Sequence, residues 1–348
     1  MDIAPIPTPL FPSNFTAKST PKLKLHWAGP GPASIVQQFG DYVISAVDNT
    51  LFVYRLMPQE TELEQICFFE AKIYIKNVSV ERNYVLISDF MHSVQLLVWS
   101  RDEYTLTMLG KDYNPCVGLS TSFLRDHSSM GLLVGDDEGN LQMLMYAPLR
   151  AESKDGTRLL LQADFHLGCE ASVLLQHPAL YTAPASASGT GQIQQSELVS
   201  SSANLVEGAR AAFKERIRQR QAALQIAPFA ARMNKKGKKD NILVGTLEGA
   251  VGVLSAVEER TYRRLALMQQ IMITSVRSVC ALNPREFRLM KTAHFRGEKK
   301  RGVLDGTLLY QYVCMDGTMQ DEIAAAMGVT ADLLLDNLRE IDLSAAVF

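Results

Sequence analysis

The sequence predicts a mostly β protein in which stacked hairpins, forming part of a β-propeller, precede a C-terminal α-helical region. Two observations lead to this prediction. A hairpin-shaped module recurs four times, and after Ser255 the hydrophobic period changes from two residues to about 3.6. Because a single hairpin is only marginally stable in water, repeated hairpins persist by stacking on their neighbours. The repetition therefore indicates a scaffold before any residue chemistry is considered.

Each module consists of an apolar run of strand length, a short polar break and a second run that is apolar or alternating. The copies are YVISAVDNTLFVYR (Tyr42–Arg55), YVLISDFMHSVQLLVW (Tyr84–Trp99), GLLVGDDEGNLQMLMY (Gly131–Tyr146) and NILVGTLEGAVGVLS (Asn241–Ser255). The first three start 42 and 47 residues apart, which is typical of four-stranded propeller blades. Their breaks contain turn-forming residues, as in Asp48-Asn49, Asp137-Glu138-Gly139-Asn140 and Glu248-Gly249.

The composition is that of a globular protein with a substantial core. The chain has 348 residues, of which 47% are hydrophobic and 21% charged, and its net charge is −2. Such a charge gives no overall attraction to nucleic acid or anionic lipid. The five cysteines lie far apart, mostly in apolar runs, and no run of membrane-spanning length or signal-like N-terminus is present. We therefore expect a soluble protein of a reducing, intracellular compartment.

We expect three regions along the chain. Residues 1–21 are a proline-rich irregular arm, residues 22–256 a partial propeller, and residues 257–348 a helical domain. A low-complexity and basic insertion over 182–239 separates the third hairpin from the fourth and is too polar to form a core of its own. Within it, residues 205–227 could form a helix.

Four helices are predicted in the C-terminal region. They cover Glu258–Ile273, Leu308–Met315, Gln320–Met327 and Asp332–Ile341. In the first of these, Tyr262, Leu265, Met268 and Met272 fall on one stripe. Thr318 and Thr330 are suitable N-caps, and Gly328 is a suitable helix stop.

The insertion is the only strongly basic stretch, with ten Lys or Arg residues against one Glu over residues 210–239. Its basic side chains predict contacts with an RNA backbone or a nuclear-import signal. The candidate residues are Arg216, Arg218, Arg220, Lys235, Lys236, Lys238 and Lys239. The alternative is a solvated segment without a partner. Only Phe213 and Phe229 interleave with the charges, so support for base stacking is weak.

Other candidate sites are better explained as structure. Gln320–Ile341 has helix-turn-helix spacing, but the acidic Asp332, Asp336, Glu340 and Asp342 would repel DNA, so we expect a packed helical hairpin. Consecutive acids at Asp136–Glu138 predict a turn and not a calcium loop. His166 and Cys169 lack the second pair that a zinc site needs. No catalytic motif occurs, and the sequence predicts no enzyme, no cofactor and no metal.

Several phrases identify a family. They are Lys111-Asp112-Tyr113-Asn114-Pro115, Ala163-Asp164-Phe165-His166-Leu167-Gly168, Gly245-Thr246-Leu247-Glu248-Gly249, Glu259-Arg260-Thr261-Tyr262-Arg263-Arg264-Leu265, Leu282-Asn283-Pro284-Arg285-Glu286-Phe287-Arg288, Val303-Leu304-Asp305-Gly306 and the ending Glu340-Ile341-Asp342 before Phe348. Together they resemble the large, scaffold-forming A subunit of the cleavage and polyadenylation specificity factor. Some are shared with its superfamily, which includes the large DNA-damage-binding protein subunit and a propeller subunit of splicing factor 3b. The TYRRL and LNPREFR phrases favour the polyadenylation member.

The resemblance implies a protein of three seven-bladed, WD40-like propellers and a C-terminal helical domain. This chain looks like its last part, with about four blades of the third propeller followed by the helices. The chain departs from the family in having Lys111 where Arg is usual, and in its long insertion. The first two propellers lie outside it, so the cleft between propellers that would hold partner subunits is incomplete. Its incomplete ring would leave unpaired edge strands for another chain or segment to cover.

The implied function is that of a non-enzymatic scaffold in nuclear pre-mRNA 3′-end cleavage and polyadenylation. Its partners would be the other subunits of that complex, with at most contacts to RNA backbone, because the resemblance assigns AAUAAA recognition mainly to neighbouring subunits. No membrane and no small-molecule substrate are implied. The alternative is a propeller adaptor of a ubiquitin-ligase, DNA-repair or splicing complex, as in the related families.

Overall fold

The computed structural model describes residues 31–57, 62–91, 93–126, 129–179, 239–276, 283–291 and 302–345. Within them, fifteen strands form four antiparallel sheets, which we call blades 1 to 4. Blade 1 holds β1 (Ile35–Phe39), β2 (Tyr42–Val47), β3 (Thr50–Met57) and β4 (Glu62–Glu70). Blade 2 holds β5 (Ile75–Glu81), β6 (Tyr84–Asp89), β7 (Val94–Ser100) and β8 (Thr105–Lys111). Blade 3 holds β9 (Gly118–Asp126), β10 (Ser129–Asp136), β11 (Asn140–Met145) and β12 (Leu160–His166). Blade 4 holds β13 (Ala171–Pro178), β14 (Asp240–Thr246) and β15 (Val251–Ser255).

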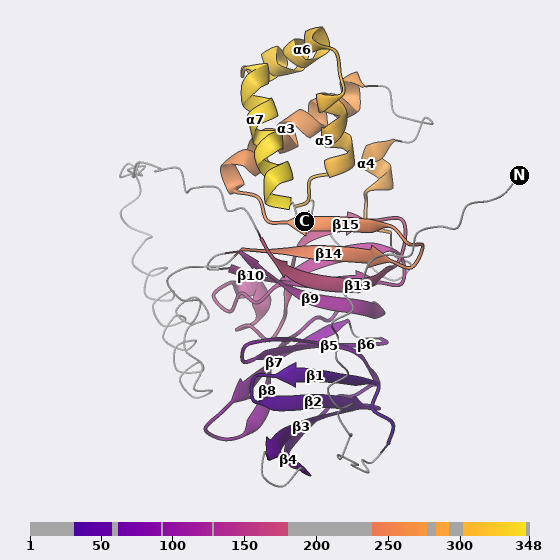
Figure 1. Cartoon of the computed structure of the whole chain (residues 1–348), viewed down its shortest axis with the longest axis vertical. Helices are drawn as coiled ribbons and strands as arrows, with labels where there is room; N and C mark the ends of the chain where they lie inside the picture. Colours follow the sequence, from indigo (N-terminus) through magenta and orange to yellow (C-terminus); the bar gives the residue numbers. More distant parts are fainter. Residues whose placement is uncertain are drawn as a thin grey trace, which may run out of the picture.

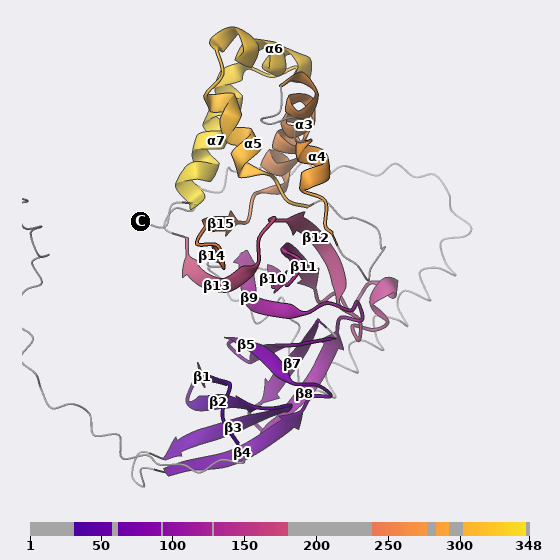
Figure 2. The ribbon, with the colours of Figure 1, turned by 90° about the vertical axis from the view of Figure 1, so that its right-hand side faces the viewer.

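The blades follow one another face to face in an arc, from blade 1 at one end to blade 4 at the other (Figures 1 and 2). The first strand of each blade lies beside the first strand of the next. All four predicted hairpins are confirmed as the β2–β3, β6–β7, β10–β11 and β14–β15 pairs. The predicted fold class, a mostly β partial propeller of four blades with a C-terminal helical region, is therefore confirmed.

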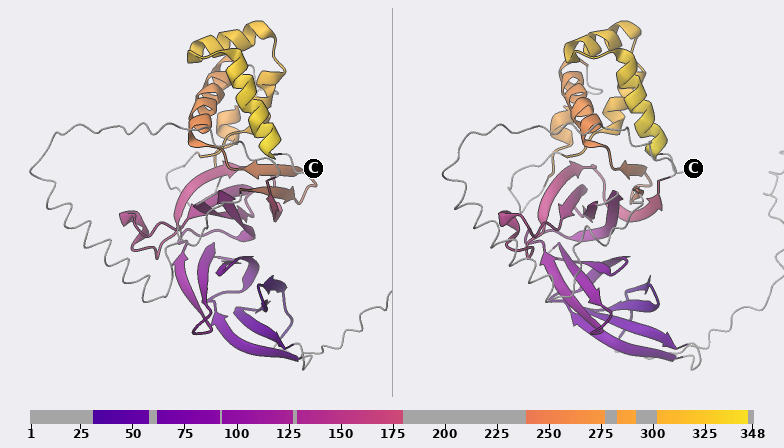
Figure 3. Two further views of the ribbon diagram at one scale, coloured as in Figure 1. Left: turned by 60° about the vertical axis from the view of Figure 1, so that its left-hand side comes forward. Right: turned by 90° about the vertical axis from the view of Figure 1, so that its left-hand side faces the viewer.

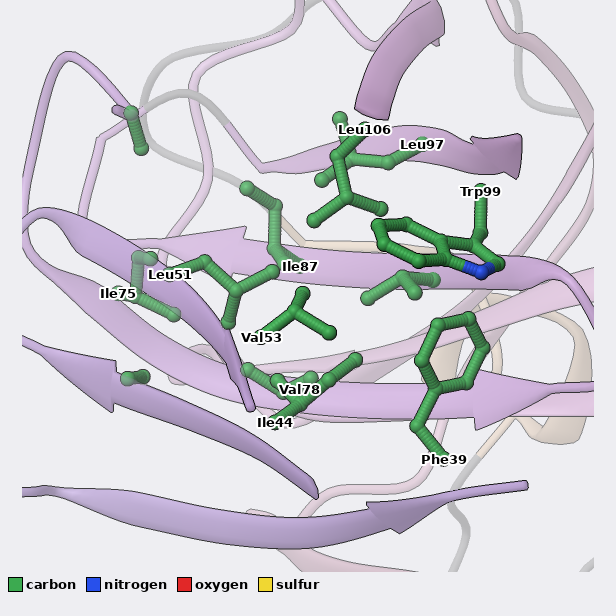
Figure 4. Packing of buried hydrophobic residues seen from close by; sticks show 13 residues of the cluster. Phe39, Ile44, Leu51, Val53, Ile75, Val78, Ile87, Leu97, Trp99 and Leu106 are labelled. Atoms are coloured by element: carbon green, nitrogen blue, oxygen red, sulfur yellow. The ribbon is translucent and has the colours of Figure 1, made fainter. Parts of the chain in front are cut away.

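Each contact between neighbouring blades is an apolar layer to which both sheets contribute. Between blades 1 and 2, Ile44 and Val53 pack against Val78 and Ile87, with Trp99 closing one end of the cluster (Figure 4). Similar clusters join blade 2 to blade 3 and blade 3 to blade 4. Successive side chains of a strand point to opposite faces, so a strand that is packed on both faces, such as β6, is apolar or buried throughout. This is why apolar runs of strand length were sufficient to locate the hairpins.

Hydroxyl groups join the innermost strands of neighbouring blades. Ser79 Oγ on β5 donates to the carbonyl of Thr121 on β9 at 2.7 Å, and Ser120 Oγ on β9 donates to the carbonyl of Ala171 on β13 at 2.6 Å. The approach of blade 4 is close at Gly135 of blade 3, where an added Cβ would lie 2.8 Å from the Cβ of Ala171 on β13. Small and hydroxylated residues therefore allow the blades to meet near the centre of the arc.

A buried aspartate closes the second hairpin turn in both middle blades. Asp89 accepts from the backbone N–H of Met91 and from Gln95 Nε2. Asp136 accepts in the same way from the N–H of Glu138 and from Gln142 Nε2. The Asp and Gln are six residues apart in each case. Because a buried carboxylate requires donors, this pairing fixes how the turn returns to the third strand.

An ion network ties blades 2, 3 and 4 together where their first strands end. Arg125, near the end of β9, pairs with the fully buried carboxylate of Asp240 at the start of β14. Its Nη1 lies 2.8 Å from Glu81 Oε1 at the end of β5, and the more exposed Arg82 lies 3.7 Å from the same oxygen. Gln176 on β13 donates to both carboxylates. One guanidinium thus holds two carboxylates from different blades.

The helices lie beyond β15, at the blade 4 end of the arc (Figures 1 and 3). They are α3 (Glu259–Ser275), α4 (Pro284–Phe287), α5 (Gly306–Val313), α6 (Gly317–Met327) and α7 (Ala331–Ala345). Leu265, Met268 and Met272 of the predicted stripe are buried among residues of α5, α6 and α7. The four predicted C-terminal helices are therefore confirmed, and so is the packed hairpin of α6 and α7. No helix in the described residues is long and apolar enough to cross a membrane.

One predicted cap is wrong and one stop is confirmed. Thr318 lies inside α6, because the extended backbone of Asp316 places the N-cap there and Gly317 begins the helix. Gly328 ends α6 in the left-handed conformation, with φ 69°. Thr330 directly precedes α7, and its capping role stays a prediction. So do the domain limits, since residues 1–21 and 182–238 lie outside the described part of the chain.

Replacing Arg125 with Ala tests the ion network. The change leaves the buried Asp240 without its cation, so the free energy of unfolding in urea should fall by about 3–5 kcal/mol. Adding Asp240→Asn to Arg125→Ala should recover part of that loss, because it removes the buried charge. Arg263→Ala, at a side chain 75% exposed in an i,i+4 pair, is the control and should change stability by less than about 0.5 kcal/mol. A loss below about 1 kcal/mol for Arg125→Ala would contradict the clamping role.

Candidate functional site

Three segments that are far apart in the sequence meet where blade 3 joins the helices. They are the end of β12 with its following loop, α4 with the residues after it, and the start of α5. We call this contact the junction. Arg288 lies at its centre, and its guanidinium carbon is 4.8 Å from the ring centroid of Phe165 and 5.0 Å from that of Phe287. Stacking between two rings holds the planar guanidinium in one orientation.

The guanidinium N–H groups of Arg288 bind both to Asp305, at the start of α5, and to the backbone at the end of β12. Nε lies 2.8 Å from Asp305 Oδ2, and Nη1 donates to the carbonyls of His166 and Leu167 at 3.2 Å each. The N–H of His166 donates back to the carbonyl of Arg288 at 3.2 Å. The segment after α4 is therefore paired with the end of β12 through both side chain and backbone.

Asp305 connects Arg288 to two helices. Its Oδ1 accepts from the N–H of Thr307 at 3.0 Å, which caps α5, and its own N–H donates to Gln269 Oε1 of α3 at 2.9 Å. A carboxylate at a helix N-terminus is favoured by the helix dipole as well as by the capping bond. Asp305 thus sets the start of α5 and its position relative to Arg288 through its side chain, and its position relative to α3 through its backbone N–H.

Asn140, at the start of β11, forms the second polar contact of the junction. Its side-chain amide exchanges two hydrogen bonds with the backbone of Lys291, at 2.6 and 2.9 Å. It also donates to Asp136, the turn aspartate of blade 3, and its Oδ1 lies 2.9 Å from Nδ1 of His166. Because Asn140 is fully buried, these partners fix both its amide orientation and the position of the chain that leads to the helices.

The environment of His166 favours the neutral imidazole. Burial lowers the pKa of His166, and the nearby positive charges of Lys291 and Arg288 lower it further. The ring packs edge-on against Phe287, with 5.8 Å between centroids. Gly168, with φ +89°, is needed beside it, because a Cβ there would lie 2.9 Å from Cζ of Phe287. His166 is therefore a packed side chain of the junction, as the sequence predicted.

The first recognised phrase has a similar structural role between blades 2 and 3. The N–H of Asp112 donates to the carbonyl of Val94 at 2.9 Å, and its Oδ1 accepts from the N–H of Asn114 at 3.1 Å. Burial raises the pKa of the Asp112 carboxyl. The DxNP phrase thus anchors the connection from β8 to β9.

Most residues predicted to contact RNA or an importin lie outside the described residues. These are Arg216, Arg218, Arg220, Lys235, Lys236 and Lys238. Lys239 is described and half-buried, and its carbonyl accepts from the N–H of Ala179 at 2.9 Å, which extends the pairing of β13 with β14. No group of His, Cys, Asp and Glu side chains in the described residues could hold a metal ion.

The junction residues Arg288, Asp305 and Asn140 were not predicted as contacts. Arg288 and Asp305 lie in the LNPREFR and VLDG phrases, which were read only as signs of resemblance, and Asn140 was read only as part of a turn. In the structure, the FHLG, LNPREFR and VLDG phrases meet at the junction. A buried polar contact between residues 17 to 151 apart has no periodicity to reveal it in one sequence.

Fold and junction together define the class of the protein as a β-propeller segment with a helical unit attached to its last blades. The chain belongs to the CPSF A subunit family, since a family model described as the CPSF A subunit region matches residues 18–313. That range covers all fifteen strands and reaches the end of α5, so the junction lies inside it.

Curated relatives carry the corresponding names. Cleavage and polyadenylation specificity factor subunit 1 of Drosophila melanogaster is 26% identical over 91% of this chain. The protein of that name from Arabidopsis thaliana is 29% identical over 82% of the chain, and Protein cft1 of Aspergillus clavatus is 25% identical over 83%. The chain spans only 19%, 16% and 18% of the lengths of these relatives.

Replacing Arg288 with Ala should loosen the helices from blade 3. The change removes an ion pair, two hydrogen bonds to carbonyl groups and two ring contacts. We therefore expect the free energy of unfolding to fall by about 2–3 kcal/mol. Backbone amides of α4 and α5 should exchange faster with deuterated water, while those of blades 1 and 2 should not. Arg288→Lys keeps the charge but not the planar fork, and should restore only part of the protection. Unchanged exchange in α4 and α5 would contradict the role given to Arg288, and exposed Arg339→Ala is the control.

Stability should fall when the pH is lowered through the range where His166 titrates. The folded state holds the pKa of His166 below its ordinary value of 6.5, so the unfolded chain binds the proton first as the pH drops. The contribution of His166 to the free energy of unfolding is therefore fully present above pH 6.5. Below that pH it falls by up to about 1.4 kcal/mol for each pH unit. Urea unfolding at pH 7.5 and 5.5 measures it, and His166→Gln should give a smaller difference between the two. An identical difference in the variant would show that other groups cause the dependence.

Proposed function

We propose that this chain is a non-catalytic scaffold unit of nuclear pre-mRNA 3′-end cleavage and polyadenylation, and that it binds other subunits of that complex. The observation that supports this most is the family match over residues 18–313, together with relatives named as subunit 1 of the cleavage and polyadenylation specificity factor. The nuclear location follows from the same process, and a basic insertion suited to import agrees with it.

The structure offers a surface suited to a protein partner. On the face of blade 4 that points away from blade 3, five aliphatic side chains are exposed, namely Val173, Leu175, Leu247, Val251 and Val253. Leu175, Leu243 and Val253 are cross-strand neighbours there, and Val173, Gly245 and Val251 form the next row. At each of the three contacts between blades, apolar side chains on the facing strands are buried by the neighbouring sheet. A subunit of the polyadenylation complex that covers this face would bury apolar surface.

The alternative is an adaptor in a ubiquitin-ligase, DNA-repair or splicing complex. The relatives' names favour polyadenylation over this alternative. RNA contact through the basic insertion is a separate prediction. Replacing Lys235, Lys236, Lys238 and Lys239 with Ala should weaken RNA binding if the insertion contacts the backbone, and should reduce nuclear accumulation if it is an import signal.

Affinity purification of the tagged chain from nuclear extract tests the proposed function. We expect polyadenylation subunits in the eluate, identified by mass spectrometry. Val251→Arg with Leu247→Arg should reduce their recovery several-fold, because two charges would face an apolar partner, while the melting temperature should not change. Tyr310→Arg, at an exposed aromatic residue of α5, is the matched control. Recovery of cullin or splicing subunits in place of polyadenylation subunits would contradict the proposal.

A further inference from the structure

The last turn of α7 lies on the face of blade 4 that carries the exposed aliphatic rows. Asn241 Nδ2 on β14 donates to the carbonyl of Ser344 at 2.7 Å, and α7 also contacts β15 (Figure 1). Ile242 and Val244 of β14 pack toward blade 3. Because side chains alternate along a strand, Asn241 and Leu243 lie on the opposite face. The chain therefore leaves α7 next to the exposed part of this face.

Asn241 also has an unused hydrogen-bond acceptor. Its side chain is fully buried, yet Oδ1 has no partner among the described residues, and neither has the buried Nδ1 of His177, its cross-strand neighbour. Asn140 shows how the same amide is satisfied elsewhere, because it binds both the carbonyl and the N–H of Lys291. At Asn241 the carbonyl comes from Ser344, but no described residue supplies the N–H. Because an unpaired buried oxygen is costly, we expect a backbone N–H of the residues that follow α7 to supply it.

The residues that follow α7 are apolar and long enough to cover the exposed rows. Residues 346–348 have the sequence AVF. Leu243 is two residues from Asn241 along β14, or about 7 Å, and the next row lies about 7 Å further. An extended chain from Ser344 to Phe348 spans up to about 14 Å. Because this segment is tethered, it binds without the translational cost of a separate molecule, so a few side chains suffice.

We propose that residues 346–348, the C-terminal segment, bind to the exposed face of blade 4. The N–H of Ala346 donates to Oδ1 of Asn241, since in an extended chain it points to the same side as the carbonyl that Asn241 already binds. The ring of Phe348 covers the aliphatic row that contains Leu243, so both the ring and the row leave water. A separate protein that covered the row would lack the bond that already holds the end of α7 beside it.

The C-terminal segment thereby controls access to this face. A subunit that covers the face, as the proposed function states, has to displace Phe348 first. Its apparent affinity is therefore reduced to the fraction of chains in which the face is free. This regulation rests on the proposed function, whereas the contact of the segment with blade 4 does not.

Photo-crosslinking within the purified full chain tests the contact. Replacing Phe348 with p-benzoylphenylalanine keeps an aromatic ring there, and this ring should crosslink to peptides of β13, β14 or β15. Leu175→Arg with Val253→Arg should lower the crosslink yield about tenfold or more, because the ring would lose its apolar contact. These two side chains are 57% and 42% exposed, so the core of the sheet is kept. Leu333→Arg, at an exposed leucine of α7, is the matched control and should leave the yield unchanged.

A second pair of variants tests the hydrogen bond to Asn241. Ala346→Pro removes the N–H that we assign to Oδ1 of Asn241 and should lower the crosslink yield about fivefold. Val347→Pro removes an N–H without an assigned partner and should have a smaller effect. Equal losses in these two variants, or crosslinks confined to other segments, would overturn the contact. So would crosslinks that join two chains in a mixture of isotope-labelled and unlabelled protein, because a second copy would then cover the face.

Recovery of polyadenylation subunits by the tagged chain measures the competition. Phe348→Ser should raise the apparent affinity for them about tenfold, the value for a face that is free in one chain of ten. Unchanged or lower recovery would overturn the regulatory role of the segment. Because the crosslinking needs no other subunit, empty eluates from every variant would contradict the proposed function alone.

Discussion

The face-to-face packing of consecutive sheets is the constraint on which the rest of the structure depends. The two middle sheets are apolar on both faces, so each needs a neighbour on either side. Strand pairing within a blade could form in isolation, but the apolar layers between blades are what make the hairpins persist. The stacked blades therefore depend on one another for stability. The exposed aliphatic rows of blade 4 are an apolar sheet face of the same kind that no described blade covers.

Polar contacts determine how the packed parts are oriented. Apolar layers tolerate small rotations and shifts, whereas the network around Arg125 and the junction around Arg288 have partners at defined positions in different blades or helices. Desolvation offsets much of the gain from such buried charges, so their main effect is specificity of arrangement. A helical unit held by Asn140, Arg288 and Asp305 has one position over blade 3.

The parts of the fold with a local period could be predicted from the sequence. The two apolar runs of Tyr84–Trp99 and the stripe of Leu265, Met268 and Met272 located strands and helices because each depends on neighbours within a few residues. The cap at Thr318 was wrong, since the choice between it and Asp316 depends on the direction in which the chain enters α6. The junction and the ion network could not be found in this way, because their members come together only after the blades have stacked.

The fixed ends of β13 and β14 determine how well blade 4 tolerates inserted sequence between these two strands. Strand pairing there continues to the hydrogen bond between Ala179 and Lys239, and Gln176 and Asp240 join the ion network directly below it. With both ends of the connection fixed in place, lengthening it costs only loop-closure entropy, at about 0.6 kcal/mol for each doubling. A long connection between two fixed strand ends is therefore only a few kcal/mol less favourable than a tight turn. This hairpin can gain or lose whole segments over evolutionary time while the register of blade 4 stays the same.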